Sequence, residues 1–235
     1  MNQNTSSSTV ANSTLYPLAH TASQSTHDIE VQRVLRNTYA LLAMTLLFSA
    51  AVASVAVAWR LPSPGLILTL VGYFGLLFAI HKMQNSAWAL PAVFELTGFM
   101  GDTLGPLLTP YLAVRGGSQT VGMALGATGV TFLALSAYAL TSRKDFSFMG
   151  SFLFMGMVIA MLAGLAAMFF DMPALSLAVS AMVALLSAGL ILFETSQIVN
   201  GGERNYVLAT VSLFVSVFNL FTSLLALFGV GGNNE

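Results

Sequence analysis

The sequence predicts an all-α integral membrane protein, a bundle of seven transmembrane helices with almost no soluble domain. Two observations predict this class. Of the 235 residues, 56% are hydrophobic and only 7% are charged, whereas a soluble domain carries about a quarter charged residues. The apolar residues also form seven runs of roughly 17 to 25 residues, each long enough to cross about 30 Å of hydrocarbon as a helix. We therefore predict a single membrane domain.

A polar segment, residues 1–29, precedes the first apolar run. It is rich in Ser, Thr, Asn and Gln and has neither a basic start nor an apolar core, so it resembles neither a signal peptide nor a spanning helix. We expect a disordered cytoplasmic tail, which is either an inert leader or a handle for a protease or partner. The transmembrane domain then covers residues 30–229, and residues 230–235 form a short C-terminal tail.

Seven predicted spans follow the tail in order. They cover residues 37–59, 64–80, 88–108, 121–140, 148–170, 174–193 and 206–228. The connections are short and several contain proline, which ends one helix and suits the first turn of the next. Neighbouring spans should therefore be antiparallel. Glycines recur at helix-packing spacing in the third span (Gly98, Gly101, Gly105) and in the fourth (Gly122, Gly126), and we expect them to let helix backbones approach closely.

Lys and Arg are distributed unevenly between the two sides of the predicted bundle. Short loops rich in these residues stay in the cytoplasm. The side of the N-terminus carries Arg33, Arg36, Lys82, Arg143, Lys144 and Arg204. Only Arg60 and Arg115 lie opposite, which predicts a cytoplasmic N-terminus and a periplasmic C-terminus. Because residues 194–204 interrupt the last apolar region, a re-entrant hairpin with both termini in the cytoplasm remains an alternative.

Three acidic residues lie inside the predicted spans. A charge at bilayer depth costs several kcal/mol unless it is paired, hydrated or protonated. Glu95 lies roughly 10 Å into the layer, and Asp102 follows seven residues later on nearly the same face. Glu194 lies more than one turn inside the sixth helix, provided that this helix stops at the Gly201–Gly202 pair. None has a Lys or Arg one turn away, so each must be protonated, exposed to water or bound to a cation.

The three acids allow different interpretations. Glu95 and Asp102 fit either a polar stripe, facing a hydrated crevice or a neighbouring subunit, or a proton or ion path. For Glu194 we favour a functional role.

Several motifs occur in the order and spacing of a known family. They are the segments 33–39, 61–66, 98–106, 141–145 and 193–198, followed by Gly201–Gly202, Ala209, Leu213 and residues 218–221. Together they cover roughly residues 33 to 229 and resemble the Bax inhibitor-1 family, most of all its bacterial YccA branch. Matching segments in the right order are more specific than any single motif.

The resemblance implies a seven-helix bundle with the last helix at its centre. Many family members carry two aspartates that form a proton-sensitive latch on a calcium leak path, and these positions fall on Glu194 and Ser216. Two close carboxylates can share a proton, which Glu and Ser cannot do. Glu194 can still accept a hydrogen bond from Ser216 or Asn219. A strong calcium site needs more oxygen charge, so Glu194 is a weak calcium candidate and no metal site is predicted with confidence.

The resemblance also implies a function and a location. Resemblance to the YccA branch implies a partner of the FtsH-type membrane protease in the bacterial inner membrane. Such a partner is a slow substrate that occupies the enzyme and so restrains it. We rank this function first, with the protease and the lipid bilayer as partners. A pH-sensitive calcium or cation leak, or a proton-coupled transporter, is the alternative, with Glu95, Asp102, Glu194, Ser216 and Asn219 as proton- or ion-sensing candidates.

Other classes of function are disfavoured by composition. The chain has no Cys and a net charge of −1, with its basic residues scattered, which argues against sulfur redox chemistry and nucleic-acid binding. His20, His27 and His81 have no metal-ligand spacing, and no nucleophile or phosphate-loop motif is present. We therefore predict no enzymatic activity and no cofactor.

Overall fold

The computed structural model describes the backbone of residues 7–231 and the side chains of residues 29–229. This part of the chain is entirely helical, as predicted. Its elements are α1 (Ser7–Trp59), α2 (Leu66–Met83), α3 (Ala89–Ala113), α4 (Gly117–Ser142), the short 3₁₀ helix η1 (Ser147–Met149), α5 (Gly150–Phe169), α6 (Pro173–Val199) and α7 (Tyr206–Gly231).

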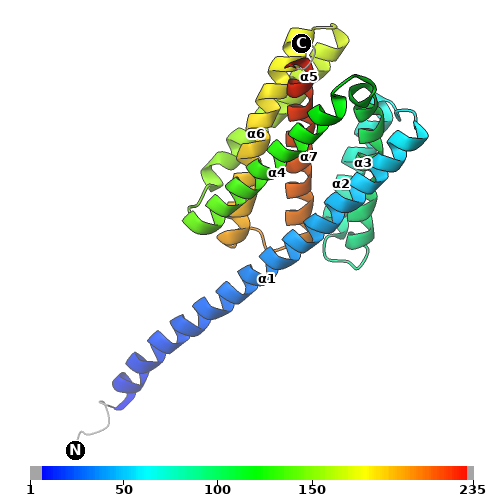
Figure 1. The fold of residues 1–235 in the computed structure, drawn as a ribbon. Helices are drawn as coiled ribbons and strands as arrows, with labels where there is room; N and C mark the ends of the chain where they lie inside the picture. Colours follow the sequence, from blue (N-terminus) through cyan, green and yellow to red (C-terminus); the bar gives the residue numbers. More distant parts are fainter. Residues whose placement is uncertain (1–6, 232–235) are drawn as a thin grey trace, which may run out of the picture.

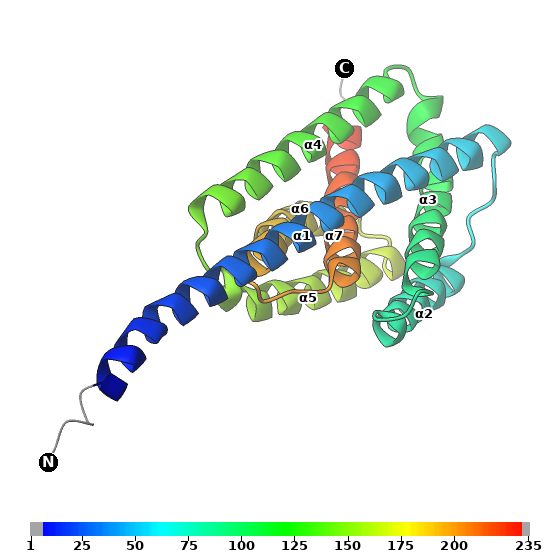
Figure 2. The ribbon, with the colours of Figure 1, turned by 90° about the horizontal axis from the view of Figure 1, so that it is seen from below.

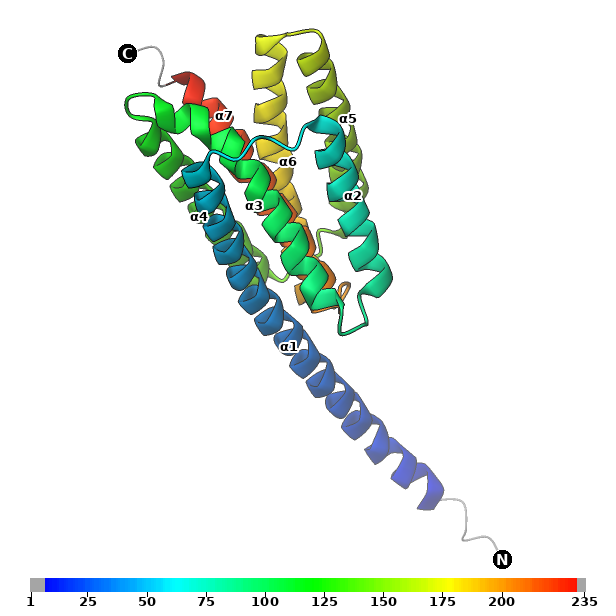
Figure 3. The same cartoon turned by 90° about the vertical axis from the view of Figure 1, so that its right-hand side faces the viewer.

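Six of the seven α-helices are long and apolar enough to cross a membrane. The exception is α3, which carries two carboxylates, Glu95 and Asp102, and three prolines. Its 25 residues nevertheless reach about 37 Å, more than the hydrocarbon thickness. Because α3 packs alongside α1 and α2 (Figure 3), it completes a bundle of seven spans, and this prediction is confirmed.

Helix α7 occupies the centre of the bundle. Seen from the end at which α1 enters, it lies in the middle, with α1, α3, α4, α5 and α6 around it (Figure 2). It contacts α1, α3, α4 and α6 directly. Leu213, Phe214 and Leu225 are each at most 1% exposed, which is typical of a helix that is apolar all round and enclosed by others. The central position implied by the family resemblance is therefore confirmed.

The glycines of α3 bring it close to α1. A Cβ atom added at Gly101 would lie 2.5 Å from the backbone oxygen of Ser49, and one at Gly105 would lie 2.4 Å from the Cβ of Ala56. Only glycine permits this approach of the two backbones, which the small-residue spacing predicts.

The same prediction is wrong for the two glycines of α4. Gly122 and Gly126 are both exposed, and an added Cβ atom would meet no described atom within 4 Å. The spacing of small residues cannot distinguish a helix face that packs from one that faces outward.

Helix ends extend beyond the apolar runs in several places. Helix α4 begins at Gly117, four residues before the predicted span, because Gln119 and Thr120 continue the helix. Helix α6 continues to Val199, and Gly201 then adopts a φ of 73°, which ends the helix as predicted.

Helix α1 extends furthest, back to Ser7. Figure 1 shows this segment projecting well beyond the bundle. From residue 7 onward, the polar segment that we predicted as a tail forms the start of α1. The boundary between tail and membrane domain at residue 29 stays a prediction.

The connections alternate between the two ends of the bundle. Those between α2 and α3, α4 and α5, and α6 and α7 lie at the end where α1 projects (Figure 1). The opposite end holds the other three connections. Helices α6 and α7 are antiparallel. With 27 and 26 residues, each is long enough to cross the membrane.

Candidate functional site

The candidate site lies where α6 and α7 pack against each other. Ser216 Oγ on α7 lies 3.1 Å from Oε1 and 3.0 Å from Oε2 of Glu194 on α6, and its hydroxyl donates to the carboxylate. Ser216 is only 1% exposed, whereas Glu194 is half-buried. The structure therefore brings together the two positions that the family resemblance pairs.

Asn219, the other residue expected as a possible donor to Glu194, does not bind it. Among the hydrogen bonds of the described residues, its side chain makes none with Glu194, so Ser216 is the donor. Asn219 lies one turn further along the same face of α7, since Ser212, Ser216, Asn219 and Ser223 follow one another at steps of four, three and four residues. These four residues form a polar line along a helix that is mostly apolar.

A cavity of about 230 Å³ opens beside Glu194. Its lining combines two carboxylates, an amide and a hydroxyl with apolar groups: Phe193, Glu194, Gln197, Ile198, Gly202, Glu203, Ala209 and Ser212. This lining includes neither Lys nor Arg. The cavity therefore presents mostly hydrogen-bond acceptors beside a carboxylate, an arrangement suited to a proton, a cation or ordered water.

Glu203 is the residue of this cavity that sequence reasoning missed. It belongs to the connection between α6 and α7, and its Oε1 accepts a hydrogen bond from the backbone N–H of Asn205 at 2.7 Å. A carboxylate in a short polar loop normally indicates a solvated charge, so nothing in the sequence separates Glu203 from other loop acids.

The two acids of α3 lie apart from this site. Glu95 is exposed and Asp102 is half-buried, and neither lines the cavity beside Glu194. They occupy the face of α3 opposite the buried residues Val93 and Met100. The structure thus separates the predicted ion-sensing residues into two groups, one between α6 and α7 and one on the outside of α3.

No larger acidic cluster joins either group. In residues 29–229, no group of three or more His, Asp or Glu side chains could hold a metal ion. The two carboxylates at the cavity, Glu194 and Glu203, offer less oxygen charge than a strong calcium site requires.

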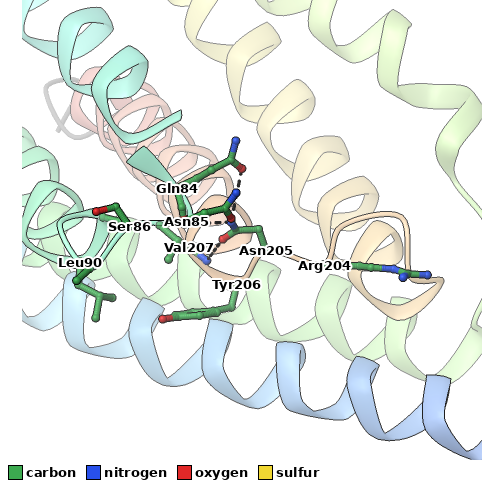
Figure 4. Close-up of a pocket in the computed structure, with 10 residues that line it drawn as sticks. Gln84, Asn85, Ser86, Leu90, Arg204, Asn205, Tyr206 and Val207 are labelled. Atoms are coloured by element: carbon green, nitrogen blue, oxygen red, sulfur yellow. Dashed lines mark hydrogen bonds between the residues drawn. The ribbon is translucent and has the colours of Figure 1, made fainter. Parts of the chain in front are cut away.

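Asn205 joins the start of α7 to the α2–α3 connection, at the end of the bundle where α1 projects. Its Oδ1 accepts the backbone N–H of Val207 at 2.9 Å, which caps the start of α7. Its Nδ2 donates to the backbone oxygen of Gln84 at 3.2 Å and to Oδ1 of Asn85 at 3.2 Å. Figure 4 shows these side chains at a pocket between the two connections, with Arg204 pointing away. One side chain thus joins the α6–α7 connection to the α2–α3 connection.

The end of α6 is also joined to the connection between α4 and α5. Ser196 Oγ donates to the backbone oxygen of Lys144 at 2.9 Å and accepts the backbone N–H of Phe146 at 3.2 Å. Asn200 Nδ2 donates to the same Lys144 oxygen at 3.2 Å. The three connections at this end are therefore joined by hydrogen bonds into one layer.

Asp145 lies in the connection between α4 and α5, outside the membrane-spanning helices, and its side chain is exposed. The side chain and the backbone N–H of Ser147 both donate to its Oδ1. These hydrogen bonds hold the pKa of the Asp145 carboxyl below its usual value.

The sequence is similar to those of several known proteins. Residues 31–234 match the family model described as inhibitor of apoptosis-promoting Bax1. The chain is 49% identical over 209 residues to the modulator of FtsH protease YccA of Escherichia coli K12, covering 87% of this chain and 95% of that protein. The inner membrane protein YccA of a second Escherichia coli strain gives the same values. An uncharacterized protein of Pseudomonas aeruginosa is 49% identical over 206 residues, covering 88% of this chain and 93% of its own.

Proposed function

The chain belongs to the Bax inhibitor-1 family, and from this we propose that it modulates an FtsH-type membrane protease. In this role it is a slow substrate that occupies the protease and so restrains the proteolysis of other membrane proteins. The similarity that supports the proposal extends from α1 to α7 and is not confined to one motif. The chain itself is a multi-pass protein of the inner membrane.

The projecting N-terminal part of α1 is the observation that carries the proposal. It leaves the bundle on the side where six of the eight Lys and Arg residues lie. By the positive-inside rule we assign this side to the cytoplasm and the C-terminus to the periplasm. An ATP-dependent protease can grip a projecting polar segment, and we propose residues 1–29 as this handle.

The bundle beyond the handle explains why degradation would be slow. Apart from the two prolines inside α3, the spans pair their backbone groups within the helix, and extraction breaks these hydrogen bonds and draws the polar loops through hydrocarbon. The first helix to be pulled, α1, is packed against α3 and α7. The protease would therefore engage the handle readily and process the remainder slowly.

The test is the half-life of the protein in cells with and without the membrane protease. We compare the full chain, a chain lacking residues 1–26, and a control lacking residues 232–235. We expect a longer half-life when either the protease or residues 1–26 are removed, with the control unchanged. An unaltered half-life in both cases would contradict the proposal.

A proton-sensitive cation leak is the second candidate function, and the cavity beside Glu194 favours it. Here Glu194, Ser216 and Asn219 would sense the proton or ion. Flux of calcium and of protons into liposomes that contain the purified protein, measured across pH, tests this candidate. We expect an acid-dependent flux that Glu194→Gln abolishes, and equal flux in the variant and the wild type would exclude Glu194 as the sensor.

A further inference from the structure

The outward face of α3 carries charge where a membrane protein normally presents apolar side chains. We define this acceptor face by Glu95, Asp102, Pro106 and Pro110, which follow one another at steps of seven, four and four residues. The opposite side of α3 is buried against the bundle. In Figure 3 the helix lies between α1 and α2 with α7 behind it. The acceptor face is open to the surroundings at Glu95, which is exposed, and partly open at Asp102, which is half-buried.

The acceptor face includes the middle of the membrane. Asp102 is close to the midpoint of the 25-residue helix, and Glu95 lies about 10 Å nearer its start. Helix α3 contains no Lys or Arg. The basic residues of the flanking helices, Arg33 and Arg36 in α1 and Lys82 in α2, lie near the ends of the spans, and Arg60 directly follows α1. Acyl chains alone cannot compensate a carboxylate at this depth.

Two backbone carbonyls add to the acceptors of this face. Pro106 and Pro110 lie inside the helix and have no N–H, so the carbonyls of Asp102 and Pro106 lose their helical donors. The nearby hydroxyl of Thr109 donates elsewhere, to the oxygen of Gly105 at 2.8 Å. The face therefore offers carboxylates and free carbonyls without a matching donor, and its natural partner must bring donors or positive charge.

We propose that the acceptor face binds a transmembrane helix of another protein that presents a Lys or Arg side chain at the depth of Asp102. A helix running beside α3 can place a second donor seven residues away, opposite Glu95. One metal ion cannot bind both carboxylates, because they are about 10 Å apart along the helix and ligand distances are about 2.5 Å. A second copy of this chain, meeting the first by a two-fold axis, would bring like charges together.

The absence of Cys from the sequence allows a clean binding experiment. Val114→Cys, an exposed position just beyond α3, carries the donor dye on the full chain in phosphatidylcholine liposomes. The probe is a synthetic single-span Leu-rich helix with one central Arg and an acceptor dye, and the control probe has Leu at that position. We expect energy transfer to reach half its maximum at about a tenfold lower density of the Arg helix, in keeping with polar contacts between membrane helices.

Variants of the chain assign the binding to the acceptor face. Asp102→Asn should reduce binding of the Arg helix to the level of the Leu helix, and Glu95→Gln should reduce it less, because Glu95 lies nearer the interface. Asp145→Asn removes the same charge outside α3 and should change nothing. Equal binding of the two probes to wild type, or an Arg preference that survives both α3 variants, would overturn the proposal. Energy transfer between copies of the chain that Asp102→Asn abolishes would identify a second copy as the occupant instead.

Discussion

Replacing Asn205 separates two ways in which one side chain holds the bundle together. Asn205→Ala removes both the cap of α7 and the bonds to the α2–α3 connection. Asn205→Ser keeps an oxygen that can cap the helix but is too short to reach Gln84 and Asn85. Loss of the cap costs about 1 kcal/mol, and each of the two cross-connection bonds about 0.5 to 1.5 kcal/mol. We therefore expect a loss of about 2 to 4 kcal/mol for Ala and about 1 to 3 kcal/mol for Ser.

The free energy of unfolding in mixed micelles, titrated with dodecyl sulfate, measures both losses on one scale. Far-ultraviolet circular dichroism follows the transition, and wild type measured in parallel gives the reference. The informative quantity is the difference between Ser and wild type, because it isolates the bonds across the connections. If Ser unfolds like wild type and Ala loses only about 1 kcal/mol, the bonds from Asn205 to Gln84 and Asn85 contribute nothing beyond the helix cap, and the hydrogen-bonded layer does not stabilise the bundle.

Three further predictions follow from the same structure. Ser216→Ala should lower the free energy of unfolding by about 1 to 3 kcal/mol, because it leaves the half-buried acidic side chain of Glu194 without its donor; a loss under about 0.5 kcal/mol would show that water replaces the hydroxyl. Gly105→Leu should cost about 1 to 3 kcal/mol by forcing α1 away from α3, whereas Gly122→Leu, with open space around it, should stay within about 0.5 kcal/mol; equal effects would contradict the packing. The pKa of Asp145 lies below its usual value, so its bonds to Ser147 are present at neutral pH and are lost as the pH falls through that lowered pKa. Protection of the Ser147 amide, which is its intrinsic exchange rate divided by the observed rate, should fall on acidification in wild type and be low at every pH in Asp145→Ala, which has no acceptor oxygen; equal protection in both proteins would refute this cap.

The fold could be predicted from hydrophobicity because each span needs a run of apolar residues of fixed length. The helix ends could not, since polar residues such as Gln119 continue a helix without contributing to an apolar run. At the candidate site, Glu194 stood out as a charge inside a span, and the family resemblance supplied Ser216. Glu203 and Asn205 could not be found in this way, because their roles depend on how connections distant in sequence meet, as in the contact of Asn205 with Gln84.

The packing of α1 links the fold to the proposed function. A protease that pulls on the N-terminus loads α1 first, and α1 is held by the close glycine contacts with α3 and by Thr210 on α7, whose Oγ1 lies 3.3 Å from the backbone oxygen of Thr38. Resistance to extraction should therefore reside in these two interfaces rather than in the bundle as a whole. Under the proposed function, Gly105→Leu should shorten the half-life of the protein in cells that contain the protease and leave it unchanged in cells that lack it. The reason is that extraction by the protease must break the contact between α1 and α3, which this substitution weakens.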